Sequence, residues 1–334
     1  MSIIQKLSEV STFTVIGASG YIGSKLVNKL TDSGCNVIRS SRRDTITNGD
    51  SEFVMAELDS LDFWLNIVEK SDVIIHLAGN TSINVANDNP ALDLNSSVVP
   101  IYRLIEACKI LRKRPRVVFA STVTAYGFTD NLPVSEATAE NPESFYDLHK
   151  FFVERQLVLA TKLNICDGVS LRLANVYGPS SANSSANDRG ILNKIIGLAL
   201  AGDIVSLYGN GNYIRDYIYI DDVVNAFLHA SVMNYDILLK RNDITLNVAS
   251  GKGASVIEVF KLISNEVEKI TGIRGTIKNV AWPKGVNEIE KRNYIASIEL
   301  FKSLTGWEPS VSLEEGIQLL VKHYSKECIS NEVS

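Results

Sequence analysis

The chain has 334 residues, of which 45% are hydrophobic and 21% are charged, an ordinary composition for a globular protein with a large core. Its formal net charge of -5 disfavours a nucleic-acid-binding protein, because such proteins are usually basic. The four cysteines form no CxxC pair, so they indicate neither a disulfide framework nor a zinc site. No signal peptide opens the chain and no apolar run reaches the roughly 18 residues that span a bilayer, so we expect a cytoplasmic protein without membrane contact.

Short apolar runs alternate with helical periodicity through the first half of the chain. The predicted strands cover 13–17, 36–38, 52–55, 72–78, 116–120 and 169–173. The predicted helices cover 21–30, 91–111 and 145–163. This alternation predicts an α/β protein with a Rossmann-type doubly wound parallel sheet and helices on both of its faces.

The pattern changes after about residue 174. A small polar run at 180–188 predicts a loop, and Gly-Asn-Gly-Asn at 209–212 predicts a hairpin. We therefore expect a dinucleotide-binding domain over 1–174 and a smaller C-terminal α/β substrate lobe over 175–330. The segment around 214–232 is expected to pack back on the first domain.

A glycine-rich turn lies between the first predicted strand and the first predicted helix. Gly17, Gly20 and Gly23 form the pattern GxxGxxG. Glycine lets the backbone turn tightly and approach a pyrophosphate, and the helix N-terminus offers free N–H groups and a positive dipole end. At a strand–helix junction the pattern predicts a dinucleotide site, although glycines alone are also consistent with an ordinary turn.

The end of the second predicted strand bears on the choice between NAD and NADP. An acidic residue there would bind the ribose 2′-hydroxyl. This chain instead carries basic and hydroxyl side chains, namely Arg39, Ser40, Ser41, Arg42 and Arg43. Such groups suit a 2′-phosphate, so we expect NADP(H) to be preferred, with NAD(H) possible. The alternative is that these arginines form a solvated surface loop.

Three side chains are candidates for the chemistry. Tyr146 and Lys150 are four residues apart on a predicted helix and therefore share one face. A nearby ammonium group and the positive nicotinamide ring favour the phenolate, so Tyr146 is suited to exchange a proton with a sugar hydroxyl. Thr122 follows a strand and so lies at the carboxyl edge of the sheet, where ligands bind in open α/β folds. The YxxxK spacing alone is common by chance and gains its value from the glycine pattern upstream.

These motifs resemble those of the extended short-chain dehydrogenase/reductases, the NAD(P)-dependent epimerase/dehydratase family that acts on nucleotide sugars. The resemblance runs from Gly17 to about Pro309, nearly the whole chain. The matching segments are GASGYIG at 17–23, HLAG at 76–79, ASTVTAYG at 120–127, YDLHK at 146–150, RLANVYGP at 172–179, YGNGNYIRDYIYIDDVV at 208–224 and GWEP at 306–309.

The resemblance implies roles for individual residues. Thr122, Tyr146 and Lys150 match the catalytic Ser/Thr, Tyr and Lys of the family, and Thr122, Asn175 and Arg215 match positions that contact the substrate. The implied cofactor-binding residues, besides Tyr146 and Lys150, are Gly17, Ser19, Gly20, Tyr21, Ile22, Gly23, Arg39, Ser40, Ser41, Arg42, Glu57, Leu58, Leu77, Ala78, Gly79 and Asn95. No metal site is expected, and structural roles are expected for His76, Arg172 and Asp216.

The sequence indicates the family more firmly than it indicates the net reaction. Val123 and Thr124 stand where water-eliminating members usually carry Asp-Glu, which disfavours a dehydratase. We expect an NADPH-dependent 4-ketoreductase of a nucleotide-linked 4-keto-6-deoxy sugar, because an NADP-type strand suits an enzyme that consumes its cofactor. The alternative is a nucleotide-sugar 4-epimerase with tightly bound NAD. A non-catalytic nucleotide sensor on this fold would typically lack the tyrosine or the lysine, and both are present.

Two predicted helices carry apolar residues beyond what one buried face requires. Leu104 and Leu111 lie on the helix at 91–111, and Phe152 and Leu159 on the helix at 145–163. Members of the family commonly dimerise through this helix pair as a four-helix bundle, so we expect a homodimer.

Overall fold

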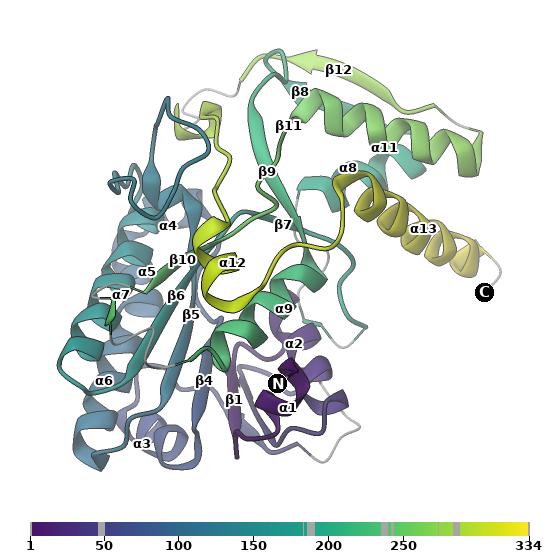
Figure 1. Ribbon diagram of the computed structural model, residues 1–334. Coiled ribbons are helices and arrows are strands. Elements are labelled where there is room, and N and C mark those ends of the chain that lie inside the picture. Colours follow the sequence, from purple (N-terminus) through teal and green to yellow (C-terminus); the bar gives the residue numbers. More distant parts are fainter. Residues whose placement is uncertain are drawn as a thin grey trace.

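The computed structural model describes residues 2–45, 51–182, 184–185, 191–234, 240–241, 244–272, 274–282 and 288–332. A seven-stranded parallel sheet, shown edge-on at the lower left of Figure 1, has the strand order β10-β6-β5-β4-β1-β2-β3. Its strands are β1 (Phe13–Ile16), β2 (Val37–Ser41), β3 (Phe53–Met55), β4 (Val73–His76), β5 (Arg116–Thr122), β6 (Asp167–Leu173) and β10 (Thr245–Val248). The predicted fold class is confirmed. The direction of winding reverses between β1 and β4, and in open α/β sheets ligands bind at such a switch point.

Helices cover both faces of the sheet, because its central strands are apolar on both sides (Figure 1). Along β4, Val73 and Ile75 join the core on one face, whereas Ile74 joins the core on the other. The first face carries α1 (Ile3–Leu7), α2 (Tyr21–Asp32), α9 (Ile220–Ser231) and α12 (Glu299–Thr305). The second face carries α3 (Leu61–Lys70), α6 (Val99–Leu111) and α7 (Phe145–Lys162).

A smaller lobe lies above the carboxyl edge of the sheet (Figure 1). Its core is formed mainly by α8 (Ile191–Leu200), α11 (Val256–Thr271) and α13 (Leu313–Glu332). It also contains the parallel pair β8 (Ile204–Tyr208) and β12 (Thr276–Val280), and a three-stranded sheet of β11 (Gly253–Ser255), β9 (Ile214–Tyr219) and β7 (Asn175–Tyr177). Since β8 pairs with β12 and not with β9, the hairpin predicted around 209–212 is wrong.

The chain returns to the main sheet after it has entered the lobe. Strand β10 is the edge strand beside β6, and α9 contacts β4, β5 and β6. The expected boundary at residues 174 and 175 therefore does not separate all of the sheet from the lobe. The separation into two domains remains a proposal.

The single helix expected over 91–111 is two helices. Helix α5 (Pro90–Ser97) ends before Val98, and α6 follows at once. Pro100 explains the break, because proline has no N–H to donate and its ring collides with the carbonyl four residues earlier. Leu104 is fully buried in the core of the second face, so the expectation that it is left over beyond the buried face is wrong.

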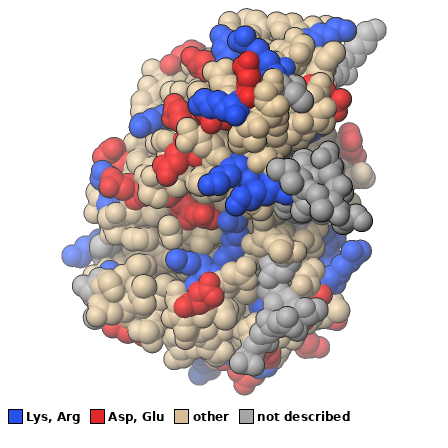
Figure 2. All heavy atoms as spheres, turned by 90° about the vertical axis from the view of Figure 1, so that its right-hand side faces the viewer, with Lys and Arg blue, Asp and Glu red and all other residues tan. Residues whose placement is uncertain are grey.

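On the face in Figure 2, Lys and Arg side chains are interspersed with Asp and Glu in small groups. Within the described ranges, no helix combines the length and apolar character that crossing a bilayer requires.

Candidate active site

A cleft of about 1340 Å³ lies between the carboxyl edge of the sheet and the smaller lobe. Its floor comes from the β1–α2 turn and the ends of β2, β4 and β5. Its opposite wall comes from β7, β8 and β9, together with Trp282, Glu290, Arg292 and Tyr294. Sites for one small molecule usually measure about 300–1,000 Å³, so this cleft has room for two ligands side by side.

The glycine turn brings backbone close to the cleft. Gly17 has φ +90°, and a Cβ there would lie 2.9 Å from the backbone nitrogen of Ala78. A Cβ on Gly23 would lie 2.1 Å from the carbonyl oxygen of Gly17, so α2 can pack against the turn only with glycine at this position. Gly20 is the N-cap of α2. The positive end of α2 therefore faces the cleft, an arrangement suited to a pyrophosphate.

The basic run at the end of β2 is divided between two environments. Arg39 is buried outside the cleft lining, where its Nη1 lies 2.5 Å from Asp44 Oδ1 and its Nε donates to Ser51 Oγ at 2.7 Å. Ser40 is also buried outside it and accepts two backbone hydrogen bonds from the glycine turn. Ser41 and Arg42 line the cleft. The expectation of a 2′-phosphate site therefore rests on Ser41 and Arg42 and not on the whole basic run.

Most of the other expected cofactor residues line the cleft, with two exceptions. The lining includes Leu58, Leu77, Ala78 and Gly79, besides all six residues expected from the glycine turn: Gly17, Ser19, Gly20, Tyr21, Ile22 and Gly23. Glu57 and Asn95 are exposed and lie outside the lining, which corrects their expected placement.

Ser97 lies two residues after Asn95. It is buried and, like Asn95, lies outside the cleft lining. Its hydroxyl has no hydrogen-bond partner among the described residues, and it lies 3.5 Å from the Cβ that Gly79 lacks. The sequence reasoning missed Ser97, because a short polar residue in a helix has no distinctive pattern.

The three candidate reacting groups meet at the carboxyl edge of the sheet. Thr122 is the last residue of β5, and Tyr146 and Lys150 project from the first turns of α7. Lys150 Nζ donates to the carbonyl of Ala120 at 2.9 Å and lies 5.9 Å from the centre of the Tyr146 ring. Thr122 and Tyr146 line the same cleft.

Burial sets the protonation of this group. It raises the pKa of Tyr146, and the nearby Asp147 carboxylate raises it further, while the Thr122 hydroxyl opposes the change. Burial also lowers the pKa of Lys150 to about 8, against the opposing charges of Asp93 and Glu154. In the protein alone the tyrosine is therefore a neutral phenol, so its ionisation needs further positive charge.

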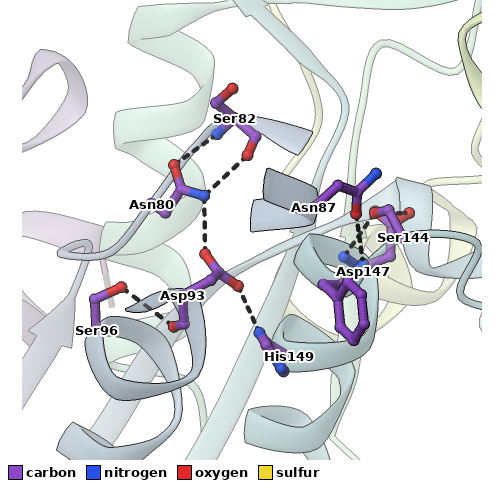
Figure 3. Close-up of polar contacts among 9 residues, drawn as sticks. Asn80, Ser82, Asn87, Asp93, Ser96, Ser144, Asp147 and His149 are labelled. Atoms are coloured by element: carbon purple, nitrogen blue, oxygen red, sulfur yellow. Dashed lines mark hydrogen bonds and ion pairs between the residues drawn. The ribbon is translucent and has the colours of Figure 1, made fainter. Parts of the chain in front are cut away.

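A buried polar network supports the lysine (Figure 3). Asp93 of α5 accepts hydrogen bonds from His149 Nδ1 at 2.6 Å and from Asn80 Nδ2 at 2.8 Å. Asn80 follows β4 and His149 precedes Lys150 on α7, so the network joins three elements of the floor. It holds a negative charge near Lys150, which favours the protonated lysine.

The residues expected to be structural lie outside the cleft lining. His76 is buried between Trp64 and Phe119, with burial lowering its pKa to about 3. Arg172 is buried in ion pairs with Glu154 and Glu140, both at 2.6 Å. Asp216 accepts hydrogen bonds from the backbone of Ser250, Gly251 and Ala296. In the described part of the chain, no cluster of His, Cys, Asp or Glu side chains could hold a metal ion.

The wall opposite the sheet carries two guanidinium groups. Arg215, expected from the sequence, lies 5.6 Å from the centre of the Tyr294 ring and donates to the carbonyl of Glu290 at 2.5 Å. Arg292 lies 5.5 Å from the same ring, and its buried Nε has no partner among the described residues. Asn175 also lines the cleft and accepts a hydrogen bond from Tyr294 at 2.5 Å. Arg292 was missed, because KRNY contains no pattern that marks a binding site.

An aromatic group lies farther along the same wall. Trp282 stacks on Tyr208, with ring centres 5.3 Å apart, and meets Tyr213 edge-on at 5.7 Å. All three line the cleft, and the sequence reasoning missed them. Their flat surfaces suit a planar ring such as a nucleobase.

The fold and the site define a Rossmann-type nicotinamide-dependent enzyme. The profile of the NAD dependent epimerase/dehydratase family matches residues 13–239, and the chain belongs to that family, as the motifs predicted. It is 32% identical over 318 residues to the putative UDP-glucose 4-epimerase of Methanocaldococcus jannaschii, covering 92% of this chain and 96% of that protein.

Solved structures agree with this placement. The UDP-glucose 4-epimerase of Thermotoga maritima with UDP-glucose superimposes with a TM-score of 0.79 at 28% identity, over 95% of this chain and 99% of that one. MoeE5 in complex with UDP-glucose and NAD gives a TM-score of 0.80 at 26% identity, with the same coverage. These relatives support the epimerase alternative better than the expected 4-ketoreductase.

Proposed function

We propose that the protein is an NAD-dependent 4-epimerase of a UDP-hexose. The observation that carries the proposal is one continuous cleft that joins a dinucleotide cradle, the Thr122–Tyr146–Lys150 group and a wall with two guanidinium groups. The resemblance to epimerases over nearly the whole chain supports it. MoeE5, which was solved with UDP-glucose and NAD, supports the choice of both ligands.

The residues of the cleft fit a nicotinamide cofactor. Its pyrophosphate would bind at the turn from Gly17 to Gly23, where missing Cβ atoms leave the backbone accessible. The hydroxyl of Ser97 offers an unpaired polar group, and Lys150 would hold the nicotinamide ribose. When bound, an oxidised nicotinamide ring would supply a reversible hydride acceptor for the sugar carbon.

The protein's own groups then handle the proton. Tyr146 as phenolate takes the proton of the sugar hydroxyl while the carbon loses its hydride, and it returns the proton when the hydride comes back. Thr122 and Lys150 stabilise the phenolate by a hydrogen bond and by charge.

We assign the substrate's nucleotide to the opposite wall. Arg215 and Arg292 would neutralise the diphosphate, because a guanidinium group pairs well with phosphate oxygens. Tyr208 and Trp282 offer a flat surface to the uracil ring. The sugar would then lie between this wall and Tyr146.

Incubation with UDP-glucose or UDP-galactose tests the proposal. Interconversion of the two sugars, followed by chromatography, with no net change in cofactor absorbance is the expected result. No interconversion of any UDP-hexose would overturn the proposal.

A second candidate, the NADPH-dependent 4-ketoreductase, is favoured by one observation. Ser41 and Arg42 line the cleft at the end of β2, where a carboxylate would select NAD. The reductase would consume NADPH stoichiometrically when a nucleotide-linked 4-keto-6-deoxy sugar is added. Tighter binding of NADPH than of NADH would support it, and tighter NADH binding would count against it.

We also propose a homodimer formed through the outer faces of α6 and α7. Phe152 and Leu159 are 42% and 57% exposed on α7, and Tyr102 and Ile110 are 58% and 56% exposed on α6. An unpaired apolar face of this kind is typical of a subunit interface. Light scattering should show a dimer for the wild type and a monomer for Leu159→Lys, whereas a monomeric wild type would contradict the proposal.

A further inference from the structure

A short segment of the opposite wall, residues 289–294, is fastened to strand β9. Ile214, the first residue of β9, donates its backbone N–H to Oδ1 of Asn293 at 2.8 Å and accepts from the N–H of Tyr294 at 3.2 Å. Strand β9 is the central strand of its sheet, hydrogen-bonded to β11 on one side and to β7 on the other (Figure 1). The segment is therefore attached to a strand that is itself held on both sides.

The guanidinium group of Arg215 supplies the rest of this attachment. Its Nη1 donates to the carbonyls of Ile214, at 3.0 Å, and of Arg292, and its Nη2 donates to the carbonyl of Glu290 at 2.5 Å. Two of these bonds reach residues that are 75 and 77 positions away in the chain. A guanidinium has five N–H groups, so only Nε and one hydrogen on Nη2 are left for other partners. More than half of the donors of Arg215 therefore hold backbone and not a ligand.

The segment carries groups that the wall offers to a ligand. Arg292 and Tyr294 both line the cleft, and Tyr294 donates to Oδ1 of Asn175 at 2.5 Å, so it also orients that amide. Arg292 is 7% exposed, and its Nη1 donates to the carbonyl of Ile289 at 2.7 Å. Its buried Nε has no partner among the described residues. A buried guanidinium with an unused donor is suited to bind an anion.

Holding Arg292 in this position costs free energy. Burial lowers the pKa of Arg292, and the like charge of Arg215 acts in the same direction. The two guanidinium groups lie 5.6 and 5.5 Å from the centre of the same ring, that of Tyr294. A buried charge tends to move towards water unless it is held, so the segment needs a firm attachment. The bonds from Arg215 to the carbonyls of Glu290 and Arg292 provide it.

We propose that Arg215 is a positioning residue, which fastens the segment 289–294 to β9 and thereby presents Arg292 to the anionic part of the substrate. The inference rests on the proposed function, because it takes the substrate to be a nucleoside diphosphate sugar. The remaining donors of Arg215 stay available to the same anion. Arg215 therefore contributes to substrate affinity twice, once by its own charge and once through Arg292.

Titration of the full-length protein with UDP, in saturating NAD⁺, tests the proposal by calorimetry. Arg215→Lys keeps the positive charge, but an ammonium group cannot bridge several carbonyls as a planar guanidinium does. Arg292→Met removes the presented charge. Each change should raise the dissociation constant of UDP by about 10- to 100-fold. The double variant should bind at most about threefold more weakly than the weaker single variant, because Arg292 is already displaced in Arg215→Lys.

A variant at Asn293 separates the holding of the segment from its charge. Asn293 is exposed, lies outside the cleft lining and carries no charge. Asn293→Leu keeps the size but removes the acceptor for Ile214, so the dissociation constant of UDP should rise by about 3- to 10-fold. This increase should disappear when Arg292→Met is already present. Arg274→Lys, at an exposed arginine outside the lining, is the matched control and should leave UDP affinity unchanged.

Other roles for Arg215 predict different results. If it were an independent second cation, Arg215→Lys would lose little affinity, and its effect would multiply with that of Arg292→Met in the double variant. If its role were purely structural, Arg215→Lys would lower the free energy of unfolding and leave UDP affinity unchanged. Either outcome would overturn the proposal while UDP still binds the wild type.

The experiment is independent of the epimerase reaction, because UDP binding needs no turnover. A wild type that does not bind UDP would overturn both this proposal and the assignment of the nucleotide to this wall. If Arg215→Lys does not fold, the combination of Asn293→Leu with Arg292→Met decides: multiplying effects would count against the proposed attachment, and the absence of a further loss would support it.

Discussion

The two walls of the cleft are built in different ways. The sheet-side wall uses backbone turns and the ends of regular elements, as at Gly17, Thr122 and Tyr146. The opposite wall consists mostly of long side chains that come together from distant segments, such as Arg215, Arg292 and Trp282. If the proposed function holds, the first wall carries the chemistry of hydride and proton transfer, and the second binds the substrate. Substitutions on each wall should therefore change different measurable quantities.

The largest expected effect is at the reacting group of the sheet-side wall. Tyr146→Phe removes the proton-transferring hydroxyl, so kcat should fall by about 100- to 10,000-fold. The dissociation constant of the cofactor should stay unchanged, because the ring is kept. Steady-state kinetics and cofactor titration measure the two quantities, and retained turnover would contradict the assigned chemistry.

The opposite wall should respond in substrate affinity. Arg292→Met removes a buried guanidinium while preserving much of the side-chain length, so the KM for the nucleotide sugar should rise by about 10- to 100-fold. Cofactor affinity should remain as in the wild type. Arg42→Met is the matched control on the cofactor side. It should weaken cofactor binding and leave the KM for the nucleotide sugar unchanged. If both variants alter the same constant, the two walls do not have separate roles.

An added methyl group under the glycine turn should lower the free energy of unfolding more than one added in the smaller lobe. Gly23→Ala places a Cβ against the carbonyl of Gly17 and should lower the free energy of unfolding by about 1–3 kcal/mol. Gly197→Ala on α8 is the matched control, because its Cβ would meet nothing within 4 Å. That change should stabilise the protein by at most about 1 kcal/mol. Chemical denaturation measures both, and equal effects would contradict the close packing at Gly23.

The last prediction concerns the pH dependence of the free energy of unfolding, through a histidine buried in the sheet. Burial lowers the pKa of His76 to about 3 in the folded protein, so below its usual value near 6.5 the unfolded chain binds a proton that the folded chain does not. Stability is therefore lost as the pH falls, by about 2 kcal/mol between pH 6.5 and pH 5. His76→Leu should show a correspondingly flatter dependence in denaturation experiments. The same slope in both proteins would show that His76 is not the group responsible.

Local patterns predicted most of the fold and much of the sheet-side wall of the cleft. Strands β1, β4 and β5 and helix α7 lie close to their expected positions, because their apolar periodicity depends only on neighbouring residues. The break between α5 and α6 was missed, although Pro100 is a local signal for it. Leu104 was also misplaced, because the helix buries more of its apolar residues than its periodicity alone indicates.

What the sequence determined by itself was the doubly wound sheet, the glycine turn and the group of Thr122, Tyr146 and Lys150. Each depends on residues that are close together in the chain or lie at the end of a regular element. Only the tertiary structure decided that Arg39 pairs with Asp44 outside the cleft, while Arg292 lies within it. It also decided that Thr124 and Asp147 meet behind the tyrosine. Which side chains enter the cleft and which pair outside it depends on how the segments pack, and no local pattern in the sequence records that packing.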